Sequence, residues 1–386
     1  MMGFAFWLSL VVLLMTAGLA IDVLVGMRKL GRLEHVPATL EEGAPRVSII
    51  FSALNEAETI EPALQSLLAI DYPNLEIIAI DDRSTDATPQ ILDRMAQVQP
   101  RLRVVHIGEL PGGWLGKNHA LCQGARIATG DYLVFTDADV MFEPRAIARA
   151  VHYCRRHGVD HLTLFISLIA RTHLLRALLV NFAIGFVSRF KPWKVNASPK
   201  HFLGLGPFNM VRRETYRACG GHAALPMEVI DDLMLGKLIK TQGYRQHVLS
   251  AGESLSVEWY RTTPEMIRGL QKNIFSGFGF QFTYLIAATL VVLLMNVWPW
   301  VGLCAVEGAA SAINAATLLV GFGLYADFVR QNGWSYRCLV FVPIVNFIAI
   351  WMWWRACVLT LLRGGIEWRG THYPLSELKQ SPLGGL

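Results

Sequence analysis

Apolar residues are concentrated in long runs near the two ends of this 386-residue chain, whereas the middle alternates between short apolar and mixed segments. Residues 4–25 contain a single charged side chain, Asp22, and three basic residues follow within the next seven positions. A run of about 20 apolar residues can cross a bilayer, and a basic flank favours the cytosolic side. We interpret residues 1–27 as an N-terminal transmembrane anchor. A cleaved signal peptide is the alternative, but the run lacks a charged start and a small-residue cleavage site.

Three apolar runs near the other end, 282–305, 308–328 and 338–362, predict a C-terminal transmembrane region over residues 282–362. Two arginines lie between the last two runs, and their placement on the cytosolic side agrees with the positive-inside rule. Three full spans would then put the tail, residues 363–386, outside. The pattern Trp368-Arg369-Gly370-x-x-Tyr373 in this tail resembles a tail that is cytosolic in related proteins. One of the three runs is therefore expected to be re-entrant or interfacial.

Two shorter segments are expected at the membrane surface. Residues 266–281 are interpreted as an interfacial segment that leads into the C-terminal region. The stretch from Leu162 to Phe190 is apolar but carries Arg171, His173, Arg176 and Arg189. Its second half is interpreted as an amphipathic helix that lies on the membrane, where a membrane-borne substrate would enter the domain.

The middle of the chain, residues 46–265, has the pattern of a separate α/β domain. Short apolar runs predict strands, and apolar positions at helical spacing predict the helices between them. Strands that alternate with helices indicate a mostly parallel, doubly wound sheet, which binds ligands at the carboxyl ends of its strands. The predicted strands are 47–51, 75–80, 102–107 and 132–136, and the helices between them begin near residues 60, 91 and 118.

Three acidic clusters in this domain are the most informative feature of the chain: Asp81-Asp82, Asp137-Ala138-Asp139 and Asp231-Asp232. The first two directly follow predicted buried strands, where an unpaired carboxylate is costly unless it binds a metal or a donor group. Carboxylates at that edge of the sheet indicate chemistry on a phosphate-bearing substrate. The alternatives are a turn for the first cluster, a solvated acidic turn for the second and N-capping of a helix for the third.

Composition narrows the class of protein. Hydrophobic residues make up 53% of the chain and its net charge is +5, which fits a membrane protein whose basic residues meet anionic lipid head groups rather than nucleic acid. The six cysteines show no CxxC spacing and indicate neither a zinc site nor a disulfide framework. Four histidines of the domain, at 119, 201, 222 and 247, show no ligand spacing either.

The order of the motifs resembles family 2 glycosyltransferases with the GT-A (Rossmann-like) nucleotide-sugar-binding fold. The resemblance covers roughly residues 46–275. The motifs that carry it are Val47 to Glu56, Ile80-Asp81-Asp82-Arg83-Ser84-Thr85-Asp86, Thr136-Asp137-Ala138-Asp139, Gly206 to Arg213 with Gly220-Gly221, and Asp231-Asp232-x-x-Leu235-Gly236. With Gly113-Trp114-Leu115-Gly116-Lys117 and the terminal apolar runs, the chain is similar to the hopanoid-associated branch, close to the ceramide and carotenoid glycosyltransferases.

The resemblance implies roles for the acidic residues. Asp232 would be the catalytic base of an inverting displacement, with Asp231 as its neighbour. Asn55, Glu56, Asp81, Asp82 and Asp137 would bind the nucleotide sugar, expected to be a UDP-sugar. Asp139, with Asp137, would hold Mg²⁺ or Mn²⁺, hard cations that take carboxylate and phosphate oxygens.

Lys117 ends a glycine-containing loop at the start of a predicted helix, where backbone N–H groups and an ammonium group suit a phosphate. A surface lysine is the alternative, because this loop is not a Walker motif.

One departure separates the chain from many relatives. Processive polysaccharide synthases carry a (Gln/Arg)-x-x-Arg-Trp motif, whereas the nearest match here is Gln271-Lys272-Asn273-Ile274-Phe275. We therefore expect a membrane-bound glycosyltransferase with a hopanoid, other isoprenoid or glycolipid acceptor, in a bacterial plasma membrane with its catalytic domain in the cytoplasm. A polysaccharide synthase and a non-catalytic lipid-binding or transport protein are the alternatives.

Overall fold

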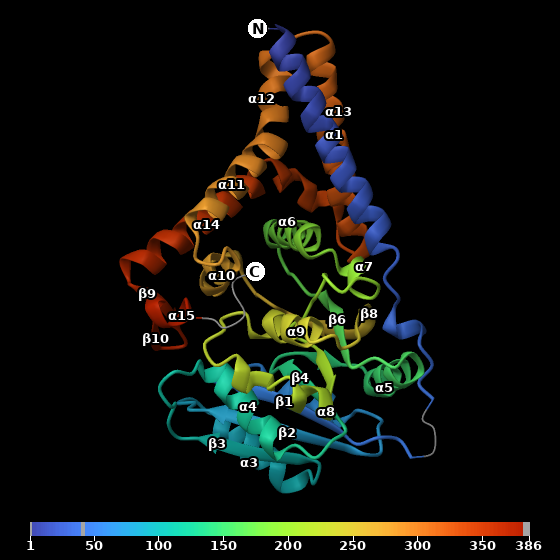
Figure 1. Cartoon of the computed structure of the whole chain (residues 1–386), viewed down its shortest axis with the longest axis vertical. Helices are drawn as coiled ribbons and strands as arrows, with labels where there is room; N and C mark the ends of the chain where they lie inside the picture. The colour runs from blue at the N-terminus through green and yellow to red at the C-terminus, as the bar shows by residue number, and fades with distance from the viewer. Residues whose placement is uncertain (1, 40–42, 381–386) are drawn as a thin grey trace.

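The computed structural model describes residues 2–39 and 43–380, so the last six residues of the predicted tail lie outside it. Two parts are visible, a compact α/β domain and an arch of apolar helices above it (Figure 1). Within the described residues the domain has one eight-stranded sheet with the order β3-β2-β1-β4-β7-β6-β8-β5. Its strands are β1 (Val47–Ala53), β2 (Leu75–Asp82), β3 (Leu102–Ile107), β4 (Tyr132–Asp137), β5 (Met141–Phe142), β6 (His161–Leu168), β7 (Asn209–Arg212) and β8 (Gln246–Val257).

The prediction of a mostly parallel sheet holds for the first half of the domain and for one later pair. Strands β1 to β4 pair in parallel, as do β6 and β8. Strand β7 pairs antiparallel with both β4 and β6, and β5 pairs antiparallel with β8. This mixed half was not predicted, because β7 reaches its partners only after a long excursion of the chain through helices outside the domain.

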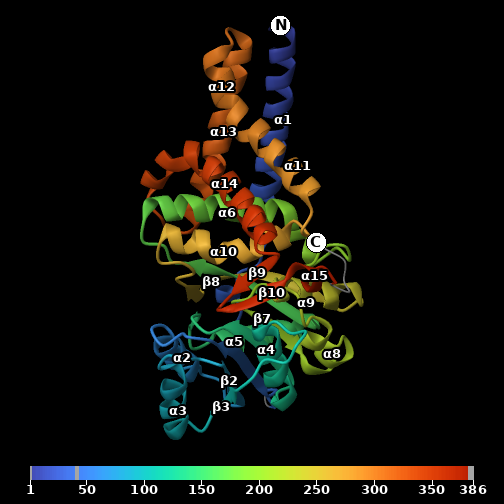
Figure 2. The ribbon, with the colours of Figure 1, turned by 90° about the vertical axis from the view of Figure 1, so that its left-hand side faces the viewer.

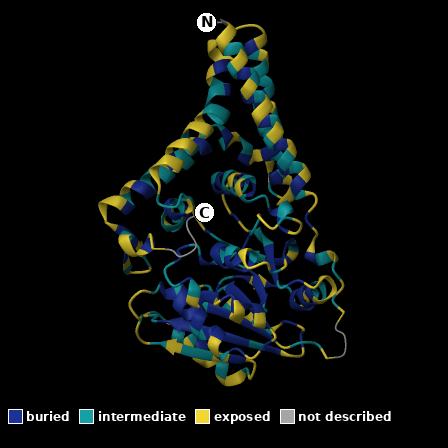
Figure 3. Cartoon of the chain, in the orientation of Figure 1, coloured by how far each residue is buried: buried dark blue, intermediate teal, exposed yellow. Residues whose placement is uncertain are grey.

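Helices on both faces of the sheet bury the apolar positions that the sequence placed at helical spacing. In α2 (Ile60–Leu68), Ile60, Ala63, Leu64 and Leu67 are all buried, which is one continuous helix face. Figure 3 shows that the sheet itself is buried almost throughout. The other helices of the domain are α3 (Thr88–Val98), α4 (Gly116–Ile127), α5 (Ala146–His157), α8 (Arg213–Ala218) and α9 (Asp231–Thr241).

Five described helices are long and apolar enough to cross a membrane. Helices α1 (Met2–Met27), α12 (Trp298–Ala305) and α13 (Ala309–Gln331) extend away from the domain side by side (Figures 1 and 2). A π-helical turn, Leu293–Val297, joins α12 to α11 (Phe282–Val292). Large apolar side chains face outward from these helices, as expected for a surface in contact with lipid.

Two helices lie across the base of this arch rather than along it. Helix α6 (His173–Phe190) runs above the domain, and α14 (Val342–Leu362) runs obliquely beside it (Figure 2). Helix α10 (Thr263–Gly277) packs against α14. Because α14 does not extend with the other long helices, the chain after it returns to the α/β domain, where β9 (Gly365–Trp368) and β10 (Thr371–Pro374) form a hairpin.

Candidate active site

The register of the parallel strands brings two of the predicted acidic positions to the same edge of the sheet. Ala53 of β1 lies opposite Asp81 of β2, and Ser52 lies opposite Asp137 of β4. The carboxyl ends of β1, β2 and β4 therefore meet there, as expected for a ligand site in a sheet of this type.

Asp81 is held by two groups. Its Oδ1 accepts a hydrogen bond from the backbone N–H of Ser84 at 3.2 Å, and its Oδ2 lies 2.8 Å from Nδ1 of His106. The other ring nitrogen of His106 lies 3.0 Å from a carboxylate oxygen of Asp93. Hydrogen bonding to Asp81 raises the pKa of His106. His106 was not predicted as a site residue, although its place near the end of β3, in register with Asp81, is a usable signal.

Asn55 and Asp82 take part in contacts within the protein. Asn55 has a φ of 55° and its side-chain oxygen accepts hydrogen bonds from the backbone of Thr85 and Asp86, so it ties together the loops that follow β1 and β2. Asp82 forms a two-pronged ion pair with Arg83, at 2.8 and 3.1 Å. A Cβ atom at Gly116 would lie 2.3 Å from an Asp82 oxygen, so only glycine fits there.

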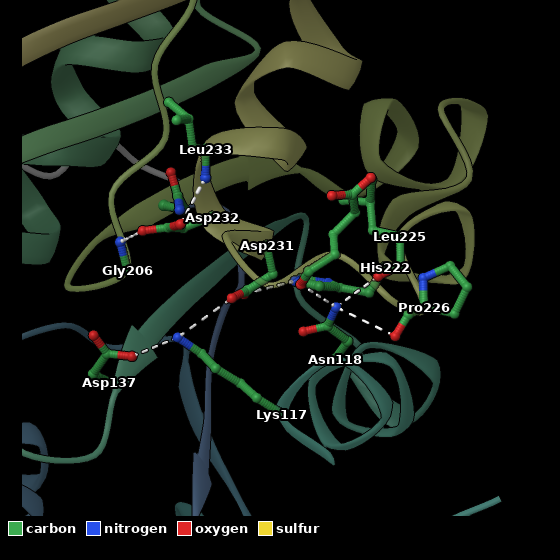
Figure 4. A network of polar contacts seen from close by, with 12 residues as sticks. Lys117, Asn118, Asp137, Gly206, His222, Leu225, Pro226, Asp231, Asp232 and Leu233 are labelled. Atoms are coloured by element: carbon green, nitrogen blue, oxygen red, sulfur yellow. Dashed lines mark hydrogen bonds and ion pairs between the residues drawn. The ribbon is translucent and has the colours of Figure 1, made fainter. Parts of the chain in front are cut away.

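Lys117 connects two of the acidic clusters. Its Nζ donates to Oδ1 of Asp137 at 2.8 Å and lies 3.8 Å from Oδ1 of Asp231 (Figure 4). The Lys117 side chain retains about a fifth of its exposure and that of Asp231 only 6%. Burial alone would lower the pKa of Lys117, but the neighbouring Asp137, Asp231 and Asp232 outweigh burial and raise it. Lys117 is therefore a charged ammonium inside an acidic site rather than a surface lysine.

Asp232 lies beside this cluster at the start of α9. Its Oδ2 accepts a hydrogen bond from the backbone N–H of Gly206 at 2.6 Å, and its Oδ1 accepts one from Leu233 at 2.8 Å. Figure 4 shows Gly206 beside the Asp232 carboxylate. A Cβ atom at position 206 would lie 2.8 Å from an oxygen of Asp137 and 3.3 Å from one of Asp232. Gly206 therefore keeps the space between the two carboxylates open.

The carboxylates differ in acidity because their surroundings differ. Burial and the charge of Asp231 raise the pKa of Asp232 to about 6. Burial also raises the pKa of Asp231. For Asp137, burial is outweighed by Lys117, and its pKa is lowered. Paired groups with such divergent acidities are typical of catalytic sites.

Asp139 lies near the charges of two other acidic side chains, Asp137 and Glu56. Burial, followed by the charges of Asp137 and Glu56, raises the pKa of Asp139 to about 7. A divalent cation would relieve this repulsion, and carboxylate oxygens are the donors that Mg²⁺ and Mn²⁺ prefer. Among the described residues, no group of three or more histidine, cysteine or acidic side chains is arranged so that it could hold one metal ion by itself. A cation held by Asp137 and Asp139 would need substrate phosphates and water to complete its shell.

His222 and Asn118 organise the wall behind Lys117. The side-chain nitrogen of Asn118 donates to the backbone oxygens of Leu225 and Glu228 at 2.6 and 2.9 Å, which fixes the loop before α9 to the start of α4. His222 lies 3.9 Å from Asp231, and burial and Lys117 lower its pKa to about 3. It is therefore a neutral, packed ring next to the site.

The C-terminal hairpin also reaches the site, and the sequence analysis did not place its residues there. Arg369, in the turn between β9 and β10, donates to the backbone oxygen of Leu54 at 2.6 Å and to Glu56 at 2.5 Å. The hydroxyl of Tyr373 accepts a hydrogen bond from the backbone N–H of Gly116 at 3.2 Å. Lys272 of α10 lies over the ring of Trp368. The one sequence signal was the Trp368-Arg369-Gly370-x-x-Tyr373 pattern in the tail.

Comparison with known proteins agrees with this geometry. The family model for glycosyl transferase family 2 matches residues 48–217. A 4,4'-diaponeurosporenoate glycosyltransferase of Staphylococcus aureus strain bovine RF122 / ET3-1 is 23% identical over 385 residues, which is 96% of this chain and 99% of the relative. The protein of the same name from strain USA300 is 22% identical over 389 residues, with the same coverage of both chains.

A solved structure shares the fold. The mannosyltransferase PcManGT from Pyrobaculum calidifontis, solved in complex with GDP-Man and Mn²⁺, aligns with a TM-score of 0.57 at 21% identity, covering 89% of this chain and 99% of that one. The GT-A fold expected from the sequence is thereby confirmed. The family match, the relatives and the order of the strands around the acidic clusters together make the chain similar to family 2 glycosyltransferases, with the family model confined to residues 48–217.

Proposed function

We propose that this chain is a membrane-bound, inverting glycosyltransferase that transfers a sugar from a nucleotide sugar to a lipid. The observation that carries the proposal is the contact of Lys117 with Asp137 and Asp231, beside Asp232, beneath helices apolar enough to cross a membrane. The family match supports sugar transfer. The names of the Staphylococcus aureus relatives, which specify a diaponeurosporenoate acceptor, support an apolar one.

The donor would bind along the carboxyl ends of β1, β2 and β4. Asp81 would accept hydrogen bonds from the base or ribose, since its carboxylate is fixed at the strand end by Ser84 and His106. Glu56, Asn55 and Asp82 shape the loops around it. We expect a UDP-sugar, and because the structural neighbour was solved with GDP-Man, a GDP-sugar is the donor to test beside it.

Asp232 would be the catalytic base. Each of its oxygens accepts one backbone N–H, which fixes the carboxylate and leaves further lone pairs for an acceptor hydroxyl. In the proposed displacement the acceptor proton passes to Asp232, the acceptor oxygen bonds to the anomeric carbon, and the nucleoside diphosphate leaves from the opposite face. One displacement inverts the anomeric centre.

Asp137 and Asp139 would hold Mg²⁺ or Mn²⁺, which when bound supplies Lewis-acid stabilisation of the leaving diphosphate. Lys117 adds a second positive charge from the start of α4. Asp231 keeps the ammonium directed into the site.

The acceptor would be a hopanoid, another isoprenoid or a glycolipid precursor that enters from the bilayer near α6 and α10. The proposed location is a bacterial plasma membrane, with the catalytic domain and the tail in the cytoplasm. This arrangement places the domain beside the basic ends of α1 and α13, where Arg28 and Arg330 both contact Asp327, at 3.0 and 2.9 Å.

The test is a transfer assay with membranes that contain the protein. Labelled UDP-glucose, UDP-N-acetylglucosamine and GDP-mannose are each incubated with native lipids and Mn²⁺, and label is counted in the organic extract. The comparison is between the wild type, Asp232→Asn and the control Asp71→Asn, which removes an exposed carboxylate outside the site. We expect label in lipid for the wild type and the control, and a loss of at least about 100-fold in Asp232→Asn.

The other outcomes point to the alternatives. Label in a water-soluble polymer alone would indicate a polysaccharide synthase. An absence of transfer with every donor would contradict the proposed reaction and favour a non-catalytic lipid-binding or transport protein. Equal transfer by the wild type and Asp232→Asn would contradict the assignment of Asp232 as the catalytic base.

A further inference from the structure

Three positive side chains from distant parts of the chain gather around Asp137. Lys117 comes from the start of α4, Lys272 from α10 and Arg369 from the turn of the β9–β10 hairpin. Lys117 contacts Asp137 directly, and all three cations contribute to the lowered pKa of that carboxyl group. Lys272 precedes the apolar helices of the C-terminal region in the sequence, and Arg369 follows them.

The hairpin turn is built to hold Arg369 in one place. Arg369 and Gly370 have φ values of 50° and 79°, the left-handed pair that closes a two-residue hairpin. Two donors of the guanidinium are used on Leu54 and Glu56. Since a guanidinium has five N–H donors, others remain for a ligand.

Lys272 is held differently. Its Nζ lies 3.2 Å from the centre of the Trp368 ring, a cation–π contact made by the residue next to Arg369. Among the described residues no carboxylate lies within ion-pair distance of this ammonium. Burial, followed by the charges of Lys117 and Arg369, lowers the pKa of Lys272 well below its usual range, and the charges of Asp231 and Asp137 only partly oppose this. Its neighbour Gln271 accepts a hydrogen bond from Arg355 of α14 at 2.6 Å, which fixes this part of α10.

An unpaired ammonium near two other cations is unfavourable unless an anion binds there. Asp137 is already paired with Lys117 and Glu56 with Arg369, so neither carboxylate serves as an ion-pair partner of Lys272. A multivalent anion at the edge of the sheet where the strand ends and the α4 N-terminus meet would supply the partner that Lys272 lacks. In a glycosyltransferase this anion is the diphosphate of the donor.

We propose that the C-terminal hairpin and α10 complete the donor site, with Lys272 and Arg369 joining Lys117 in binding the diphosphate of the nucleotide sugar. This inference rests on the proposed function. The hydroxyl of Tyr373 accepts a hydrogen bond from the backbone N–H of Gly116 and so positions the loop that carries Lys117. Donor binding then depends on the segments that connect the domain to α14.

The experiment measures nucleotide binding by the full-length protein in detergent, with Mn²⁺ present. UDP and GDP are titrated as diphosphate probes, and UMP and GMP as monophosphate probes that share the bases. The variants are Lys272→Met and Arg369→Gln. The matched control is Arg363→Gln, which removes an exposed arginine that pairs with Glu367 at the base of the same hairpin.

We expect each variant to weaken binding of the preferred diphosphate at least about tenfold, as for loss of a charge-assisted hydrogen bond. Binding of the matching monophosphate should change less than about threefold, and the control should bind both like the wild type. Lys272→Arg and Arg369→Lys, which keep the charge, should recover part of the affinity. Thermal unfolding of every variant establishes that it is folded.

Unchanged diphosphate affinity in folded Lys272→Met and Arg369→Gln would overturn the inference. Equal losses for diphosphate and monophosphate would also overturn it, because they indicate that the residues only support the shape of the site. A wild type that binds neither UDP nor GDP would instead contradict the proposed function, so the two failures are distinct.

Discussion

Gly206→Ala tests whether the space between Asp137 and Asp232 is the place where the donor reacts. The glycine lies in the loop before β7, and its backbone N–H donates to Asp232. The three atoms nearest to an added methyl group all belong to the side chains of Asp137 and Asp232, and none is a backbone atom. The methyl group would therefore point at the two carboxylates. The change is therefore directed at the site rather than at the fold.

The size of the effect follows from the distances. The new Cβ would lie 2.8 Å from Oδ2 of Asp137, whereas ordinary contacts begin at 3.4 Å. The carboxylate must therefore move by roughly 0.6 Å, which disturbs the 2.8 Å hydrogen bond from Lys117 to its other oxygen. Loss of a hydrogen bond between charged groups costs about 1.5–3 kcal/mol. That corresponds to a decrease of roughly 10- to 150-fold in kcat/KM for the donor.

The assay is transfer of label from the donor to lipid at several donor concentrations, with thermal unfolding as a check of folding. Gly108→Ala is the matched control, because a Cβ atom there meets nothing within 4 Å. Folded Gly206→Ala with wild-type kcat/KM would refute the assignment of this space to the donor. A similar loss in Gly108→Ala would show that the effect is not specific to the site.

Four further predictions follow from the same geometry. Because Asp232 must be ionised and its pKa is raised to about 6, turnover at saturating donor should fall about tenfold per pH unit below 6 and be level above 7; a flat profile from pH 5 to 8 would contradict this. A chelator should abolish transfer, Mn²⁺ or Mg²⁺ should restore it, and activity that survives chelation would exclude a metal role. Gly204→Ala places a Cβ atom 1.9 Å from the backbone oxygen of Asp232, so it should destabilise the protein by more than about 3 kcal/mol in thermal unfolding, unlike Gly206→Ala. In intact cells, an impermeant thiol reagent should label a cysteine at Gly3 but not one at Gln380, and the reverse would place the domain outside.

Local sequence patterns predicted the first half of the domain well. The bounds of β3 are as predicted, and β1, β2 and β4 extend by one or two residues beyond the predicted runs. These strands are short apolar runs between clear turns, and their partners are close in sequence. The spacing of apolar residues and the positions of turn residues are therefore enough to predict them. The alignment of Asp81 and Asp137 at one edge follows from parallel pairing alone.

The second half of the sheet could not be predicted in the same way. Strand β7 has four residues and lies between β4 and β6, with two helices intervening in the sequence between β6 and β7. A strand of four residues is too short to show a distinctive alternation of apolar and polar positions. Its antiparallel direction depends on where the chain re-enters the sheet after the two helices. Tertiary contacts decide such pairings, and no local pattern records them.

The same reason explains why Arg369 and Lys272 were not assigned to the site. Arg369 is more than 300 positions from Glu56, its partner in the structure. A comparison with the motif of polysaccharide synthases identified Lys272 only as a departure, since the expected arginine and tryptophan are absent from that segment. The structure provides a tryptophan ring from the hairpin and an arginine from α14 at the same place. Folding brings together residue types that the local motif lacks.

The course of α14 links the membrane region to the chemistry. If all three C-terminal apolar runs crossed the bilayer, Arg369 would be on the opposite side from Glu56, and their ion pair could not form. Because α14 lies across the base of the arch, the hairpin returns to the domain, and the basic ends of α1 and α13 lie on that side as well. The helix that fixes the hairpin also holds α10 through Arg355 and Gln271. A shift of α14 in the membrane would therefore move Lys272 and Arg369 together, so the geometry of the proposed donor site depends on how this helix is seated in lipid.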